Sequence, residues 1–67
     1  METKEVKRNL NRRVRYGDSN NYLMSACLIK KNKHGEAYYL AELIDVTAPR
    51  SLIYVPLNDI SEVSRDD

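Results

Sequence analysis

Residues 22–46, YLMSACLIKKNKHGEAYYLAELIDV, decide which fold this chain can adopt. Two apolar runs, 22–31 and 37–46, flank a polar spacer that contains Asn32 and Gly35. Asn and Gly tolerate a positive φ, so the spacer has the composition of a hairpin turn. The Tyr, Ile and Val side chains in the flanking runs favour strands. This region therefore predicts a β-hairpin.

A helical interpretation competes, because four side chains of the second run have helical spacing: Ala37, Leu40, Ala41 and Ile44. Two helices would leave the third apolar run, 51–57, as a single strand without a sheet, and such a strand is not stable. Strands over 22–31, 37–46 and 51–57 are therefore expected to form a meander. Residues 17–21 and 47–50 have the composition of connecting loops, and Asn58 or Asp59 can open a short helical turn.

The N-terminal segment 3–15 is basic and has apolar residues every four positions, at Val6, Leu10 and Val14. This spacing predicts a short helix, with Thr3 as N-cap and Gly17 as a possible end, that runs into a strand near Val14. Alternatively, the first strand begins at Arg13. The expected fold is mainly β, or α+β at most. It is a small curled antiparallel sheet or an SH3/OB-like mini-barrel of three to four strands, with a possible short N-terminal helix. Residues 1–67 form one domain, with 1–5 and 64–67 frayed.

The two prolines bear on the last predicted strand, because proline has no N–H to give to a β-ladder. Pro49 is expected in the turn before the strand, and Pro56 near its end. Neither interrupts residues 51–55, which are therefore predicted to keep an edge that can pair with another strand.

A chain of 67 residues gains only about 3–5 kcal/mol from its own core and often needs another source of stability. Cys27 is the only cysteine, so an internal disulfide is excluded, and it is expected to be a buried thiol. His34 is the only histidine, and its spacing from Cys27 matches no zinc site. No metal or cofactor is expected, and a second chain is the best remaining stabiliser. Without a long apolar run or a signal-peptide pattern, a cytoplasmic location is expected.

The predicted strands carry apolar residues on both faces, whereas a strand buried on one side alternates with polar residues. The core can take only one face, so the other is expected to dock onto a second copy or a protein target. No catalytic motif is present, and we expect a small non-enzymatic binding or adaptor protein that dimerises, docks onto a target, or both. In its size and style it resembles phage and mobile-element accessory proteins that inhibit a host factor. The candidate interface residues are Tyr22, Tyr38, Tyr39, Arg50, Ile53, Tyr54 and Val55.

The charges are unevenly distributed. Residues 1–33 contain nine Lys or Arg against three acidic residues, a net charge of +6, and residues 34–67 contain two against seven, a net charge of −5. A dense basic cluster can bind phosphates, so an RNA- or single-stranded-DNA-binding β module is the alternative function. Its candidate residues are Lys7, Arg8, Arg12, Arg13, Arg15, Lys30, Lys31 and Lys33.

A local motif supports the same alternative. Residues 46–50, VTAPR, together with Arg12-Arg13-Val14, resemble elements of the CsrA/RsmA family of small dimeric RNA-binding proteins. The resemblance covers about eight residues, and it implies a strand-exchanged dimer that holds RNA with Arg12, Arg13 and Arg50. The segment between the two motifs is longer here than in that family, and the chain ends soon after Ile60, where the family has a helix.

Overall fold

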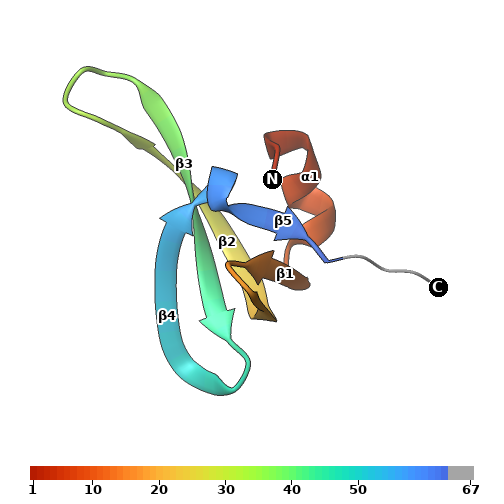
Figure 1. Ribbon diagram of the computed structural model, residues 1–67. Helices are drawn as coiled ribbons and strands as arrows, with labels where there is room; N and C mark the ends of the chain where they lie inside the picture. Colours follow the sequence, from red (N-terminus) through yellow and green to blue (C-terminus); the bar gives the residue numbers. More distant parts are fainter. Residues whose placement is uncertain (64–67) are drawn as a thin grey trace.

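The computed structural model describes residues 1–63 and shows one five-stranded antiparallel sheet with a short helix at the N-terminus (Figure 1). The strands lie in the order β4-β3-β2-β1-β5. The predicted mainly β fold is confirmed, with five strands instead of three to four. The sheet is curled, and among the described residues its two outer strands, β4 and β5, do not pair. The elements are α1 (Thr3–Asn9), β1 (Arg13–Tyr16), β2 (Ser19–Lys31), β3 (Ala37–Asp45), β4 (Ala48–Pro56), the 3₁₀ helix η1 (Leu57–Asp59) and β5 (Ile60–Glu62).

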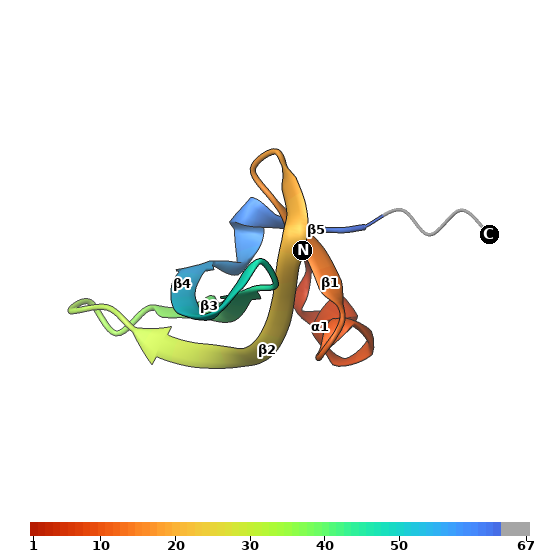
Figure 2. The ribbon, with the colours of Figure 1, turned by 90° about the horizontal axis from the view of Figure 1, so that it is seen from below.

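The 13-residue strand β2 connects the two halves of the sheet. Its first part pairs with β1, and β3 lies along most of its other edge. A bulge at Ser25 interrupts the β2–β3 register between Met24 and Ala26. Bulges bend a strand and increase its twist, and Figure 2 shows β2 sweeping in a long curve from the β1 side to the far hairpin. This curvature gives the sheet a concave and a convex face.

The core lies on the concave face. Alternate residues of the strands point into it, and η1 and β5 supply further apolar side chains. Val6 of α1 packs against this cluster from the helix side. The buried members are Val14, Met24, Ala41, Leu43, Val55, Leu57 and Ile60.

The predicted N-terminal helix is present, but it is shorter than the apolar spacing suggested. Its N-cap is Glu2 and not Thr3: the Glu2 N–H donates to Glu5 Oε1 at 2.9 Å, and the Glu5 N–H donates to the Glu2 carbonyl at 3.0 Å. The helix ends at Asn9, so Gly17 does not end it. Gly17 has a φ of +60° and lies in the β1–β2 turn, a conformation that glycine adopts without steric cost.

Two predicted loops are shorter in the structure. The connection predicted at 17–21 is shorter because β2 already begins at Ser19, and the one predicted at 47–50 is shorter because β4 begins at Ala48. Pro49 therefore lies inside β4 and not before it. Residues 49–51 have no partner in β3, since Asp45 pairs with Ala48 and Ile44 with Leu52. This irregularity lets the strand accept a proline.

The short helical turn expected at Asn58 or Asp59 is η1. Of the two segments predicted to fray, only residues 1–5 belong to the described part of the chain. Residues 1–5 include the first turn of α1, whereas 64–67 fall outside the described residues. Within residues 1–63, no helix is long and apolar enough to cross a membrane.

Candidate functional site

The convex side of β2, β3 and β4, here called the outer face, is unusually apolar. Residues directly opposite each other in antiparallel strands point to the same side of a sheet. Successive residues along a strand point to opposite sides, so the residues that alternate with the core residues lie together on the outer face. Its members are Leu23, Ala26, Leu28 and Lys30 of β2, Tyr38, Leu40, Glu42 and Ile44 of β3, and Leu52, Tyr54 and Pro56 of β4.

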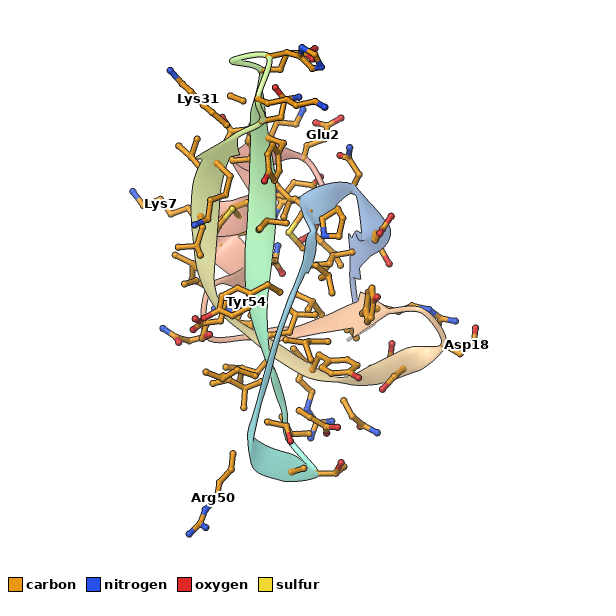
Figure 3. The ribbon with its side chains drawn as sticks, turned by 90° about the vertical axis from the view of Figure 1, so that its left-hand side faces the viewer. Glu2, Lys7, Asp18, Lys31, Arg50 and Tyr54 are labelled. Atoms are coloured by element: carbon orange, nitrogen blue, oxygen red, sulfur yellow. The ribbon has the colours of Figure 1, made fainter. Side chains whose placement is uncertain are left out.

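Three large side chains of the outer face are strongly exposed. Leu52 is 50% exposed, Tyr54 51% and Tyr38 43%. In Figure 3, η1 and β5 lie to the right of β4, on the side away from Tyr54, and α1 packs against the core cluster through Val6. The aliphatic side chains of β2 and β3 on this face are partly buried. The face is thus a continuous apolar surface that the described part of the chain does not cover.

Glu42 is the one acidic side chain on the outer face, and its neighbours hold it in place. The Tyr54 hydroxyl donates to Glu42 Oε2 at 2.7 Å, and Ser25 Oγ donates to Glu42 Oε1 at 2.7 Å. These two hydrogen bonds, first that of Tyr54, lower the pKa of Glu42, and the same contact raises the pKa of Tyr54. Glu42 is therefore a fixed anion in an apolar surface, able to accept a cationic partner group.

The predicted interface residues divide between the two faces. Tyr38 and Tyr54 lie on the outer face, and Arg50 is exposed near the β3–β4 turn (Figure 3). Tyr39 points to the concave side but is exposed at the end of the β2–β3 hairpin. Tyr22 is half-buried, and its ring meets the Tyr16 ring edge-on at a centroid distance of 5.8 Å.

Two predicted interface residues face the core instead. Val55 is only 6% exposed and belongs to the buried cluster, and Ile53 packs against that cluster. Both alternate with the outward residues Leu52 and Tyr54, so Val55 is buried and Ile53 is partly buried on the concave side. The prediction omitted the aliphatic residues of the outer face. The alternation along 51–55 separated the two faces but did not reveal which one the core would occupy.

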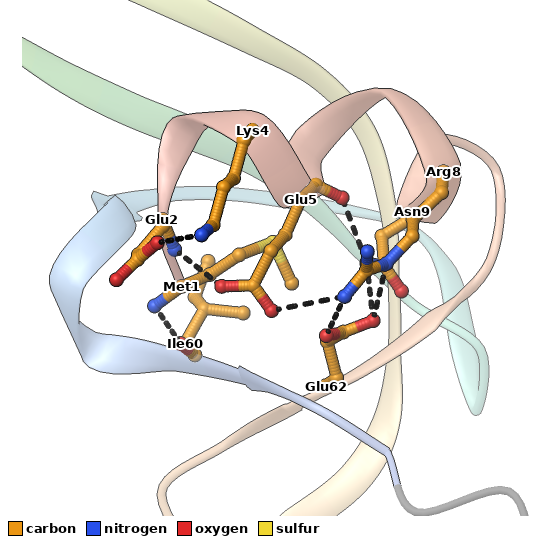
Figure 4. A network of polar contacts seen from close by, with 8 residues as sticks. All are labelled: Met1, Glu2, Lys4, Glu5, Arg8, Asn9, Ile60 and Glu62. Atoms are coloured by element: carbon orange, nitrogen blue, oxygen red, sulfur yellow. Dashed lines mark hydrogen bonds and ion pairs between the residues drawn. The ribbon is translucent and has the colours of Figure 1, made fainter.

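The basic residues do not form one patch. Arg8 is held in an ion-pair network between α1 and β5 (Figure 4). Its Nε lies 3.0 Å from Glu62 Oε2 and its Nη2 lies 2.6 Å from Glu62 Oε1, while Asn9 Nδ2 donates to Glu62 Oε2 at 2.9 Å. These donors, first Arg8, hold the pKa of Glu62 far below its usual range, and Glu62 raises the pKa of Arg8. Arg8 thus serves the fold.

The remaining basic candidates are exposed but separated. Arg13 lies opposite Leu23, whereas Lys30 lies seven residues further along β2, about 23 Å away along an extended strand at 3.3 Å per residue. Arg15 contacts the Gly17 carbonyl at 3.2 Å and Asp18 at 4.0 Å. Lys31 and Lys33 extend from the β2–β3 hairpin, Lys7 from α1, and Arg12 precedes β1. The structure therefore brings together only parts of the predicted nucleic-acid surface.

Cys27 and His34, the chain's only cysteine and histidine, lie apart from each other in the β2–β3 hairpin. Cys27 is a free thiol on the concave side opposite Ala41, half-buried, and burial raises its pKa. His34 lies exposed in the β2–β3 turn, where its N–H donates to Asn32 Oδ1 at 2.8 Å. In the part of the chain that the structure describes, no three His, Cys, Asp or Glu side chains are grouped to hold a metal.

A second concave feature lies between the N-terminus, the base of the β2–β3 hairpin and η1. It is a half-open depression of about 500 Å³ lined by residues 1–3, 37–39 and 56–58. Its charged groups among the described residues are the Glu2 carboxylate and the Met1 ammonium, which donates to the Leu57 carbonyl at 3.1 Å. Its lining offers no grouping of acid, base and nucleophile.

Comparisons with known proteins returned nothing: no family model, no curated protein and no solved structure matches this chain. The local resemblance to the CsrA/RsmA family gains no support from them.

Proposed function

We propose that this chain is a small non-enzymatic binding protein whose outer face docks onto a protein surface, either a second copy or a target protein. The observation that carries the proposal is the uncovered apolar outer face with exposed Leu52, Tyr54 and Tyr38. Exposed contiguous apolar surface of this kind is typical of protein interaction sites. A cytoplasmic location belongs to the same proposal, since the single free thiol needs no oxidising compartment.

The chemistry of the outer face favours a protein partner over a nucleic acid. Its aliphatic and tyrosine side chains match the residues found at the centres of protein interfaces. Glu42 lies among them as an anion, and a phosphate backbone would be repelled by it. Lys30, at the end of the hairpin, is the only cation that the register places on this part of the sheet.

A capture experiment with matched variants tests the proposal. The tagged native chain is compared with Leu52→Ser and with Tyr38→Ser, two exposed outer-face changes, and with Asp18→Asn in the β1–β2 turn as the control. Proteins captured from a lysate of the source cell are identified, purified and titrated against each variant. Binding that weakens tenfold or more in the outer-face variants, but not in Asp18→Asn, supports the proposal. Equal binding by all four proteins contradicts it.

The same experiment separates the nucleic-acid alternative. Every capture is repeated after nuclease treatment and with the double variant Arg12→Ala, Arg13→Ala. If capture disappears with nuclease and with the double variant, while Leu52→Ser has no effect, the chain binds nucleic acid through its basic residues. The protein-binding proposal is then wrong.

A further inference from the structure

We infer that the open edge of β4 pairs with β4 of a second copy of this chain, in antiparallel register about a two-fold axis at Leu52. The inference goes beyond the proposed function, because it concerns the edge of β4 and leaves the outer face of each copy open to a partner. It joins two outer faces into one surface that spans both sheets.

The first argument is the free edge of β4. The strand is nine residues long and is the last strand of the sheet, so alternate N–H and C=O groups point away from β3. Both prolines lie near its ends, at positions 49 and 56, and residues 50–55 contain none. Proteins commonly protect such edges with prolines, bulges or charges. In β4 these features lie toward the two ends, with Pro49, Arg50 and the irregular segment 49–51 at one end and Pro56 at the other, so residues 52–55 contain none of them.

The second argument is register. In a two-fold antiparallel pair, one residue faces its own copy, and residues equally distant from it on either side face each other. An axis at Leu52 places Leu52 opposite Leu52 of the partner subunit, and Arg50 opposite Tyr54 of the partner subunit. Axes at Ser51 or Ile53 would place Arg50 opposite leucine or proline. Only the Leu52 register gives the Arg50 guanidinium an aromatic ring to stack on.

The third argument is charge. Arg50 is the only Lys or Arg in residues 35–63, and no ion pair or hydrogen bond of its side chain is found among the described residues. In the proposed pair its counter-charge is Glu42 of the partner subunit, since the Glu42 carboxylate accepts the Tyr54 hydroxyl at 2.7 Å. Neighbouring strands lie about 4.8 Å apart, so in the proposed pair the Cα atoms of Arg50 and Glu42 of the partner subunit are separated by two strand spacings, about 10 Å. The two extended side chains can span this distance across the Tyr54 ring, twice in each dimer.

The exposed position of Arg50 fits this arrangement. In Figure 3 the Arg50 side chain extends away from the sheet at the lower end of β4, on the same side of the ribbon as Tyr54. Arg50 lies within the irregular segment 49–51, which has no partner in β3.

Sedimentation equilibrium over a concentration series tests the association. The native chain is expected to be a dimer at micromolar concentration. Arg50→Glu is expected to raise the dimer dissociation constant at least tenfold, because it places two acidic side chains near each other at each end of the pair. The double variant Arg50→Glu, Glu42→Arg restores opposite charges and is expected to recover most of the affinity. Lys33→Glu, a charge reversal of the same size at the exposed hairpin turn, is the control and is expected to leave the constant unchanged.

Disulfide trapping tests the register. In a Cys27→Ser background, Leu52→Cys is expected to form a covalent dimer on mild oxidation, because directly opposite Cα atoms lie about 4.5–5.5 Å apart, within disulfide range. Ala48→Cys is the matched control. In the proposed register the two copies of residue 48 are offset by eight residues, about 27 Å, and are expected to stay unlinked.

Each outcome has a distinct meaning. A monomer at all concentrations, a dimer insensitive to Arg50→Glu, or trapping by Ala48→Cys instead of Leu52→Cys overturns this inference. The proposed function still stands in those cases if the outer-face variants lose a captured protein. Conversely, a dimer with the expected trapping confirms the inference, even if no further target is captured.

Discussion

Two leucines on adjacent strands test which face of the sheet is the core. Leu43 on β3 points to the concave side and is fully buried, whereas Leu52 on β4 points outward and is 50% exposed. Each is changed to alanine in the full chain. The two substitutions remove the same atoms, Leu43 from a central strand and Leu52 from the edge strand, and the buried site is expected to show the larger loss of unfolding free energy.

The expected magnitudes differ severalfold. A buried Leu→Ala change removes transfer free energy and leaves a cavity, at a cost of about 2–5 kcal/mol. A core of this size supplies only about 3–5 kcal/mol in total. Leu43→Ala is therefore expected to be largely unfolded or close to its unfolding midpoint at 25 °C. Leu52 keeps half of its surface in water, so its truncation is expected to cost about 1 kcal/mol or less.

Urea unfolding, followed by far-ultraviolet circular dichroism, measures both costs. The titrations are made at the lowest workable protein concentration and repeated at a tenfold higher one. If Leu52 is buried between two copies, the cost of Leu52→Ala rises with concentration, whereas that of Leu43→Ala shifts only with the overall stability of the dimer. Equal costs at low concentration, or a larger cost for Leu52→Ala, would show that the face assignment is wrong.

Three further predictions concern single residues. Arg8 and Asn9 lower the pKa of Glu62 in the folded chain, so the ionised Glu62 carboxylate contributes its full stabilisation above the unfolded carboxyl pKa of about 4.3 and loses it as the pH falls below that value. Glu62→Gln is therefore expected to lower the urea midpoint at pH 7 and to flatten the decline of the midpoint in acid. A pH profile identical to that of the native chain would contradict this. Gly35 has a φ of +78°, with open space where a Cβ would lie. Gly35→Ala is therefore expected to cost about 1 kcal/mol of backbone strain and to lower the Tm by about 4–8 °C. An unchanged Tm in a thermal melt would refute the turn geometry. The Cys27 thiol has a raised pKa and is half-buried, so its reaction with a thiol reagent at pH 8 is expected to be slower in the folded chain than in urea. Equal rates would show that this thiol is not packed on the concave side.

The meander could be predicted because its signals are local. The turn at Gly35 and the apolar runs on either side of it favour a hairpin, and the neighbouring run 51–57, which needs a sheet, argues against the helical alternative. Residue alternation also separated Leu52 and Tyr54 from Ile53 and Val55, as observed. Which pair would be buried depends on α1, η1 and β5, which come from the two ends of the chain, and no local pattern contains that information.

The errors have the same origin. The strand expected near Val14 is present as β1, but the helix ends at Asn9 and not at Gly17, because tertiary pairing takes Val14 into the sheet. Pro49 has the composition of a turn, but an edge strand that arches away from its neighbour accepts it. The strand β5 has only three residues, Ile60–Glu62, too few for a periodic pattern, and it exists because β1 offers an edge to pair with.

The pairing of β5 with β1 also sets the order in which the molecule can assemble. Every other strand pair joins neighbours along the chain, whereas Val14 pairs with Glu62 and Tyr16 with Ile60, across almost the whole sequence. Closing so long a loop costs entropy before any contact is gained, so this pair forms after the meander and opens before it. Hydrogen exchange is therefore expected to be fastest, among the strands, in β1 and β5, and each such opening breaks the Arg8–Glu62 contact that ties α1 to the sheet. Local opening of the β1–β5 pair would release both ends of the chain and leave β2, β3 and β4 with their outer face intact.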